Sequence, residues 1–281
     1  MMSTKGVYQV FKTAISLFVK GDVLGRDVPA LTYSTLKALI PVLALMYVVG
    51  TALGCGTVLE SWLRVTLESQ PTVADYLVGF VHNYLENTRS QYILLVGIIL
   101  MLYTLYLLVR KIENTFDRIW GVPLRKTRHT LWFYPAIFLF CVVMILVAYA
   151  MNVLAIALAH QVISQEYLGT LRPIVIQIAT FIPLFAFLVF LYAVVPNTKV
   201  RLCSTLWPAF LSGILMAFLQ YFYVKAQFAL ASYNVIYGSL AALPLFLLWM
   251  QFLWTICTFG GTLAYANQLH SSSVENEADK G

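Results

Sequence analysis

The stretch Gln91–Val109, QYILLVGIILMLYTLYLLV, decides the fold class, because it runs for 19 residues without a charged side chain. A helix needs about 20 consecutive apolar residues to cross the hydrocarbon core of a bilayer. The rest of the chain is similar: 60% of its 281 residues are hydrophobic and only 11% are charged. A soluble domain carries about 25% charged residues, which coat its water-facing surface. The sequence therefore predicts an integral membrane protein and excludes a soluble globular domain.

Six apolar stretches in all are long enough to cross a bilayer. They lie at 31–53, 91–109, 131–158, 173–195, 204–230 and 236–266. Strands are not expected, because the runs are too long and the alternation with period two is absent. The expected fold class is therefore all-α, a polytopic membrane helix bundle whose six transmembrane helices occupy 31–266.

The segments outside these spans predict surface helices and a tail. Within 1–30, polar residues recur at helical spacing opposite an apolar face, which predicts a cytoplasmic amphipathic segment on the membrane surface. The first outer loop, 54–90, has a similar pattern together with four acidic residues, and predicts a helical cover. The residues 267–281 are expected to form a disordered cytoplasmic tail.

The lysine and arginine residues set the expected orientation. Of the 18 basic residues, 13 fall in the N-terminal segment, the 110–130 connection, the 196–203 turn and the tail. Only three fall on the opposite side: Arg64, Arg89 and Arg172. Basic residues are enriched in cytoplasmic loops, so both termini are predicted to be cytoplasmic.

Nothing in the sequence predicts catalytic or cofactor chemistry. The four histidines lack metal-ligand spacing, the four cysteines contain no C-x-x-C pair, and no glycine-rich phosphate loop occurs. We therefore expect no catalytic residue, no metal site and no cofactor. The basic residues follow the membrane topology and form no face interleaved with aromatic side chains, so nucleic acid is not an expected partner.

The acidic residues argue against one mechanism of transport. None of the 12 is placed deep in a predicted span; Glu113 and Asp117, for example, are assigned to the basic inner loop 110–130. Ion-coupled transporters usually keep a carboxylate within the membrane. A carboxylate-driven antiporter is therefore disfavoured.

A few polar residues in or near the spans are candidates for lining a substrate path. They are Lys37, Tyr33, Asn152, Gln220, Lys225 and Tyr237. In this interpretation the two lysines attract an anionic lipid head group. The competing interpretation is that the lysine stems reach the interface and leave the ammonium groups in water, while the amides bridge helices.

Three segments together resemble a known family. They are Leu31-Thr-Tyr33-Ser34-Thr-Leu36-Lys37-Ala-Leu-Ile-Pro41, Phe116-Asp117-Arg118-Ile119-Trp120, and a third that begins at Tyr192-Ala-Val-Val-Pro196-Asn-Thr-Lys199-Val200 and continues through Gly213, Tyr237-Gly238-Ser239-Leu240 and Pro244 to Trp249. In their order and position these segments are similar to the motifs of the YihY/BrkB family, formerly labelled ribonuclease BN. The resemblance implies a six-span, multi-pass protein of the bacterial inner (cytoplasmic) membrane.

One departure from the family pattern limits what the resemblance implies. Where the family has LLGAE, this chain has Thr258-Phe-Gly260-Gly261-Thr262, so Thr262 replaces a glutamate. No role of that glutamate can be carried over to this chain. The ribonuclease label finds no support either, since the chain offers neither metal ligands nor a basic groove, and we expect no enzyme.

The leading hypothesis is a transporter or binder of an anionic, lipid-like component of the envelope. Its expected partners are membrane lipids, either an anionic lipid or a lipid-linked glycan. The alternative is a non-transporting scaffold of an envelope-assembly complex that docks through the acidic 54–90 loop, as a homo-oligomer or with a complex partner. A third class is a channel. Substrate, energy source and direction of movement stay open at this point.

Overall fold

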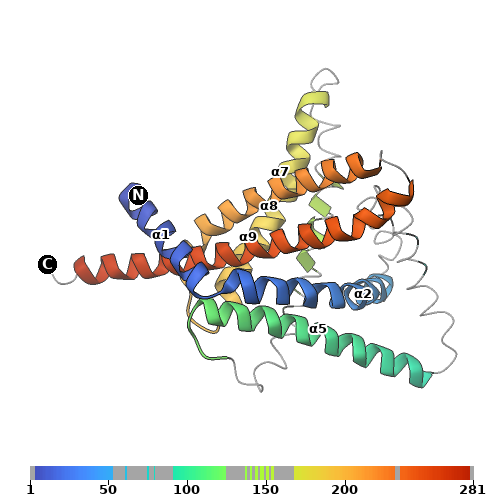
Figure 1. Cartoon of the computed structure of the whole chain (residues 1–281), viewed down its shortest axis with the longest axis horizontal. Coiled ribbons are helices and arrows are strands. Elements are labelled where there is room, and N and C mark those ends of the chain that lie inside the picture. Colours follow the sequence, from blue (N-terminus) through green and yellow to red (C-terminus); the bar gives the residue numbers. More distant parts are fainter. Residues whose placement is uncertain are drawn as a thin grey trace. The chain divides into compact units, whose positions relative to one another are not determined.

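The residues that the computed structural model describes form helices joined by short turns. These residues are 4–52, 61, 75, 79, 91–124, scattered positions between 137 and 154, 168–231 and 235–278. The elements are α1 (Thr4–Lys20), the π-helix η1 (Val23–Asp27), α2 (Val28–Ala52), α5 (Gln91–Ile119), α7 (Leu168–Val194), α8 (Leu202–Ala231) and α9 (Val235–Ala278) (Figure 1). This part of the chain contains no strand, as the sequence predicts.

Three of these helices carry segments long and apolar enough to cross a membrane. The segments are Gln177–Val194 in α7, Leu202–Ala229 in α8 and Pro244–Ser273 in α9. They correspond to the fourth, fifth and sixth predicted spans. The structure therefore supports a helical membrane protein. The count of six spans stays a prediction: α2 and α5 are helical over the first two, while most of 131–158 lies outside the described residues.

The chain divides into two compact units. Unit 1 consists of Met1–Pro29, Glu113–Tyr221 and Gln251–Gly281, and unit 2 of Ala30–Ile112 and Phe222–Met250. Unit 1 thus holds α1, η1, the end of α5, all of α7, most of α8 and the second half of α9. Unit 2 holds most of α2 and α5, with Tyr223 of α8 stacked on Trp249 of α9 at 4.7 Å between ring centroids.

Two adjacent glycines of α9 allow three other helices to pack closely against it in unit 1. A Cβ atom on Gly260 would overlap the hydroxyl oxygens of Ser212 in α8 and Tyr192 in α7. A Cβ atom on Gly261 would lie 2.5 Å from the Phe116 ring of α5. Small residues let helix backbones approach one another where lipid supplies no hydrophobic drive. The glycine pair therefore defines the point at which α5, α7 and α8 meet α9.

The N-terminal helix α1 packs along α9 in the opposite direction. Val10 and Ala14 form a buried cluster with Leu263 and Ala266 of α9. Gly6, near the start of α1, lies against His270, whereas Phe18, near its end, packs against Phe259, eleven positions earlier in α9. The start of α1 and the end of α9 therefore lie at the same end of unit 1 (Figure 1).

The surface of α1 refines the prediction for 1–30. The segment is helical, but its buried face, made by Val10, Ala14 and Phe18, packs on protein. A second apolar stripe, at positions 8, 15 and 19, is exposed; Val19, for example, is 70% exposed. These three positions fall on one side of a helix with 3.6 residues per turn. The helix therefore has an apolar side left over for lipid.

Two expectations about where helices end need correction. The helix α5 continues to Ile119, so Glu113 and Asp117 lie in a helix and not in an inner loop. The helix α9 continues to Ala278, where the sequence predicts a disordered tail from 267 onward. Three serine hydroxyls, those of Ser271, Ser272 and Ser273, donate hydrogen bonds to backbone carbonyls one turn earlier. These bonds are compatible with a helix, so a polar tail need not end it.

The glycine contact generates a testable stability prediction. Gly260→Ala should lower the free energy of unfolding by about 1–3 kcal/mol, because the new methyl group overpacks the contact with Ser212 and Tyr192. The measurement is thermal unfolding in detergent, followed by tryptophan fluorescence. Gly79→Ala is the matched control, since a Cβ there meets no atom within 4 Å. Equal melting midpoints for the two variants would contradict the proposed packing.

Candidate functional site

A turn between α1 and α2 sets up the candidate site. Helix α1 ends at Lys20, and Asp22 then takes a left-handed conformation with φ 51°, which aspartate tolerates better than most residues. Gly25 leaves room for the Asp22 carboxylate, because a Cβ at this position would lie 2.5 Å from Asp22 Oδ1. The π-helix η1 follows and leads directly into α2. This turn places Arg26 and Asp27 against the end of α5.

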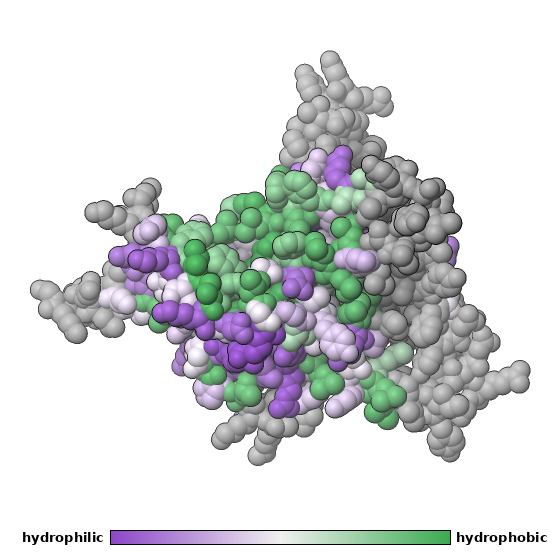
Figure 2. Space-filling model, viewed as in Figure 1, coloured by the Kyte–Doolittle hydropathy of each residue, from purple (hydrophilic) through white to green (hydrophobic). Residues whose placement is uncertain are grey.

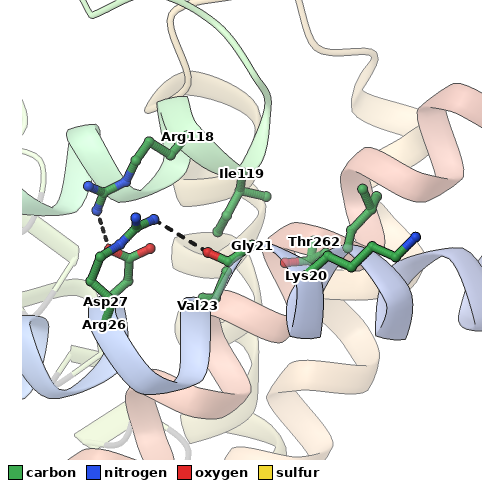
Figure 3. Close-up of a pocket in the computed structure, with 9 residues that line it drawn as sticks. Lys20, Gly21, Val23, Arg26, Asp27, Arg118, Ile119 and Thr262 are labelled. Carbon is green, nitrogen blue, oxygen red and sulfur yellow. Dashed lines mark hydrogen bonds and ion pairs between the residues drawn. The ribbon is translucent and has the colours of Figure 1, made fainter.

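Asp27 joins this turn to α5 through an ion pair. Its side chain is 1% exposed, and its Oδ1 atom accepts a hydrogen bond from Arg118 Nη2, 91 positions later in the chain. Arg26 Nε lies 3.5 Å from the same oxygen, while Arg26 Nη2 donates to the Gly21 carbonyl at 3.3 Å (Figure 3). Burying a carboxylate is costly unless a cation pairs with it. Asp27 therefore holds two guanidinium groups at one place.

The two guanidinium groups remain accessible at the wall of a cavity. The side chains of Arg118 and Arg26 are 41% and 53% exposed. The cavity, which we call the basic pocket, has a volume of about 350 Å³ and is lined by Leu17, Lys20, Gly21, Val23, Arg26, Asp27, Arg118, Ile119 and Thr262. Three positive side chains and one carboxylate give it a net charge of +2. Guanidinium groups bind phosphates and carboxylates through paired hydrogen bonds, so the pocket suits an anion.

The pocket lies where polar residues gather in unit 1. Figure 2 shows hydrophilic residues over the neighbouring ends of α1, η1 and α5, and hydrophobic residues over α8. We call this the basic end of unit 1. The residues Leu17, Val23 and Ile119 add apolar side chains to the lining of the pocket.

The residue next to Arg118 has a structural role at the same end. Asp117 is fully buried, and its Oδ1 atom accepts a hydrogen bond of 2.7 Å from the backbone N–H of Asn197. Asn197 Nδ2 in turn donates to the Pro123 carbonyl at 3.0 Å. These bonds tie the end of α5 to the turn between α7 and α8, residues 195–201.

Helix α9 holds the other side of that turn. Gln268 Oε1 accepts from the Arg201 backbone N–H at 3.0 Å, and Gln268 Nε2 donates to the Lys199 carbonyl at 3.2 Å. Asn267 Nδ2 donates to the Ser204 carbonyl at 3.0 Å. Backbone groups outside helices need such partners when they lie in a packed structure. Side chains of α5 and α9 therefore hold the 195–201 turn and the start of α8 in place.

Four of the predicted path residues have described side chains. Lys37 Nζ lies 4.4 Å from the centre of the Tyr33 ring, one turn earlier on α2, and both side chains are exposed. Gln220 and Lys225 are exposed on α8. Tyr33, Lys37 and Lys225 belong to unit 2, and none of the four lines the basic pocket. Among these four described side chains, the structure brings Tyr33 and Lys37 together.

The other two candidates lie outside what the structure describes. Asn152 is not among the described residues, and Tyr237 lies in α9 with no description of its side chain. Among the described residues, no three His, Cys, Asp or Glu side chains come together as a metal site would require.

Asp27 and Arg118 are not among the site residues predicted from the sequence. In that prediction Arg118 is one of the basic residues of the 110–130 connection and part of a family motif, while Asp27 lies in the amphipathic segment 1–30. Glu113 and Asp117 are four residues apart, a spacing that places both carboxylates on one face of a helix. This spacing could have indicated that the helix continues beyond residue 109. In the structure both carboxylates are buried, at 2% and 0% exposure.

Comparisons with known proteins agree on one family. A family model described as virulence factor BrkB matches residues 26–280. A UPF0761 membrane protein of Teredinibacter turnerae is 29% identical over 257 residues, which cover 88% of this chain and 57% of the relative. One from Alcanivorax borkumensis is 29% identical, with 86% and 56% covered. One from Haemophilus influenzae is 25% identical, with 86% and 88% covered.

The relatives differ in length. The chain spans a little over half of the Teredinibacter and Alcanivorax proteins and most of the Haemophilus protein. No solved structure matches the chain.

The Asp117 contact generates a second prediction. Asp117→Ala should speed amide hydrogen exchange in the 195–201 turn, because the Asn197 N–H loses its acceptor. Leaving a buried donor unsatisfied costs about 1–3 kcal/mol. Exchange followed by mass spectrometry of the peptide over this turn makes the measurement. Asp117→Asn, which retains an acceptor oxygen, should lie closer to wild type. An unchanged exchange rate in Asp117→Ala would show that the bond does not hold the turn.

Proposed function

The chain belongs to the virulence factor BrkB family of membrane proteins, matched over residues 26–280, and on that premise we propose that it binds an anionic lipid head group in the basic pocket. The three sequence motifs had indicated this family, and that prediction is confirmed. The observation that carries the proposal is the pair of accessible guanidinium groups, Arg26 and Arg118, at the wall of a cavity of about 350 Å³.

The size of the pocket favours a head group over a whole lipid. Sites for small molecules have volumes of about 300–1,000 Å³, so this pocket is at the small end of that range. It can hold a phosphate and a few further atoms, while acyl chains stay in the bilayer. Thr262, which lines the pocket, belongs to the segment of α9 that is long and apolar enough to cross a membrane.

Thr262 also bears on the charge of the pocket. In the family pattern a glutamate stands at this position, and a carboxylate there would reduce the net charge from +2 to +1. Threonine leaves the positive charge in place and adds a hydroxyl group. The departure from the family pattern therefore favours an anion in this particular chain.

The charge distribution sets the proposed location. Hydrophilic residues gather at the end of unit 1 that carries α1, η1 and the end of α5, as Figure 2 shows. Lys20, Arg26 and Arg118 are basic residues of this end. Cytoplasmic surfaces of inner-membrane proteins carry an excess of basic residues. The proposal therefore places the protein in the bacterial inner membrane, with the basic pocket facing the cytoplasmic leaflet. The exposed apolar stripe of α1 would lie in the same leaflet, as interfacial helices do.

The proposal concerns binding and involves no catalytic step. Transport of the bound lipid is the wider hypothesis. The scaffold alternative depends on the 54–90 loop, nearly all of which lies outside the described residues, so no contact of the structure favours it.

Arg118→Ala tests the proposal directly. It should weaken binding of phosphatidylglycerol by on the order of tenfold, as expected for the loss of charge-assisted hydrogen bonds worth about 1.5–3 kcal/mol. Native mass spectrometry of the detergent-solubilised protein, titrated with phosphatidylglycerol or phosphatidylcholine, gives the two affinities. Arg201→Ala is the matched control, since it removes an exposed positive charge of unit 1 outside the pocket. An equal loss of phosphatidylglycerol affinity in both variants would mean that only the overall positive charge matters, and it would overturn the site.

Asp27→Asn tests whether the carboxylate competes with the lipid. Asp27 occupies the arginine donors in the structure, so its neutralisation should strengthen phosphatidylglycerol binding several-fold in the same titration. Phosphatidylcholine binding should not change. A weaker affinity for phosphatidylglycerol would instead mean that the carboxylate is needed to hold the arginines in place.

A further inference from the structure

A second pocket lies farther along the contact between α1 and α9. It has a volume of about 370 Å³, and we call it the polar pocket. Its lining comes from α1 and from the last part of α9: Gln9, Val10, Lys12, Thr13, Ala266, Leu269, His270 and Ser273. It shares no lining residue with the basic pocket.

The two pockets follow one another along the same side of the α1 and α9 pair within unit 1, and we call this side of the pair the groove between α1 and α9. Positions 10 and 13 of α1 line the polar pocket, and positions 17 and 20 line the basic pocket. This spacing of three, four and three residues keeps all four on one side of a helix. On α9, position 262 lines the basic pocket, and positions 266, 269 and 273 line the polar pocket, again on one side.

Helix geometry gives the separation of the pockets. The α9 residues of the polar pocket lie about seven positions beyond Thr262, which is about 10 Å along a helix that rises 1.5 Å per residue. A head group with a phosphate and at least one ring can extend over such a distance. Both pockets lie alongside the same pair of helices, so one ligand can contact both.

The chemistry of the polar pocket differs from that of its neighbour. The lining offers an amide, two hydroxyl groups, an imidazole and one ammonium group, from Gln9, Thr13, Ser273, His270 and Lys12. It contains no carboxylate. Neutral donors and acceptors of this kind hydrogen-bond to the hydroxyl groups of sugars and polyols. Leu269, which is 40% exposed, adds an apolar surface for the C–H face of a ring.

Local contacts hold two of these groups in place. His270 lies against the backbone of Gly6, where a Cβ atom would be 3.1 Å from His270 Nε2. Ser273 Oγ donates to the Leu269 carbonyl at 2.9 Å, which leaves its oxygen lone pairs able to accept a hydrogen bond. These contacts place the imidazole and the hydroxyl at the wall of the pocket.

We infer that the polar pocket binds the sugar or cyclitol ring of a head group whose phosphate lies in the basic pocket. The substrate class is then an anionic lipid with a glycosyl or cyclitol head group, in place of an acidic phospholipid without such a ring. This inference rests on the proposed function. It adds a specificity site, because the basic pocket recognises charge and the polar pocket recognises ring hydroxyls.

Two lipids of equal charge test this inference. Phosphatidylinositol and phosphatidylglycerol both carry one negative charge, but only the first has a polyol ring. Native mass spectrometry with each lipid should show that the wild-type protein prefers phosphatidylinositol by on the order of tenfold, as expected for added neutral hydrogen bonds. The double variant Gln9→Ala with Ser273→Ala should lose this preference and keep its affinity for phosphatidylglycerol.

Controls separate this inference from the proposed function. Ser271→Ala changes a serine of α9 that lines neither pocket, so it should retain the preference. Equal wild-type affinities for the two lipids, with Arg118→Ala still weakening both, would overturn the polar pocket and leave the proposed function standing. If Arg118→Ala weakens neither lipid, the proposed function fails, and this inference fails with it.

A soluble competitor distinguishes a lipid from a free phosphate ester. Inositol 1-phosphate should displace phosphatidylinositol only at much higher concentration, because it lacks the acyl chains that remain in the apolar surroundings of the pocket. Equal potency would overturn the assignment to a lipid.

Discussion

The close contact at Gly260 and Gly261 is the constraint on which unit 1 depends. Because these two positions lack side chains, Tyr192, Ser212 and Phe116 reach the backbone of α9 from three different helices. Lipid tails are as apolar as the side chains of the spans, so burial alone does not draw such helices together. Close packing at small residues supplies the attraction instead. The positions of the end of α5 and of the basic pocket follow from this contact.

The end of α5 shows how one helix turn serves two purposes. Asp117 and Arg118 are neighbours in sequence, but successive residues of a helix point about 100° apart. Asp117 therefore binds the turn between α7 and α8, while Arg118 reaches Asp27 and the basic pocket. The carboxylate that fixes the fold and the guanidinium that faces the cavity are thus held by the same rigid element. A displacement of α5 would affect both.

The groove between α1 and α9 brings together two kinds of recognition. At one point arginine side chains surround a single buried carboxylate, and about 10 Å farther along the lining is mostly neutral and rich in hydrogen-bonding groups. Charge attracts an anion without much regard to its shape, whereas neutral hydrogen bonds depend on the positions of individual atoms. Combining the two in one groove would let the protein distinguish lipids that have equal charge.

The sequence by itself determined the membrane class, the helical nature of the described spans and the family. Hydropathy, and motifs together with their order along the chain, can be read without knowing which distant residues come into contact. The sequence also indicated an anionic lipid, but through Lys37 and Lys225, and neither lysine lines the basic pocket or the polar pocket. Only the tertiary structure assembled the basic pocket, since Asp27, Arg118 and Thr262 come from three distant segments. No periodicity links them. Their meeting depends on helix packing at the glycines and on the pairing of a buried carboxylate with a guanidinium group.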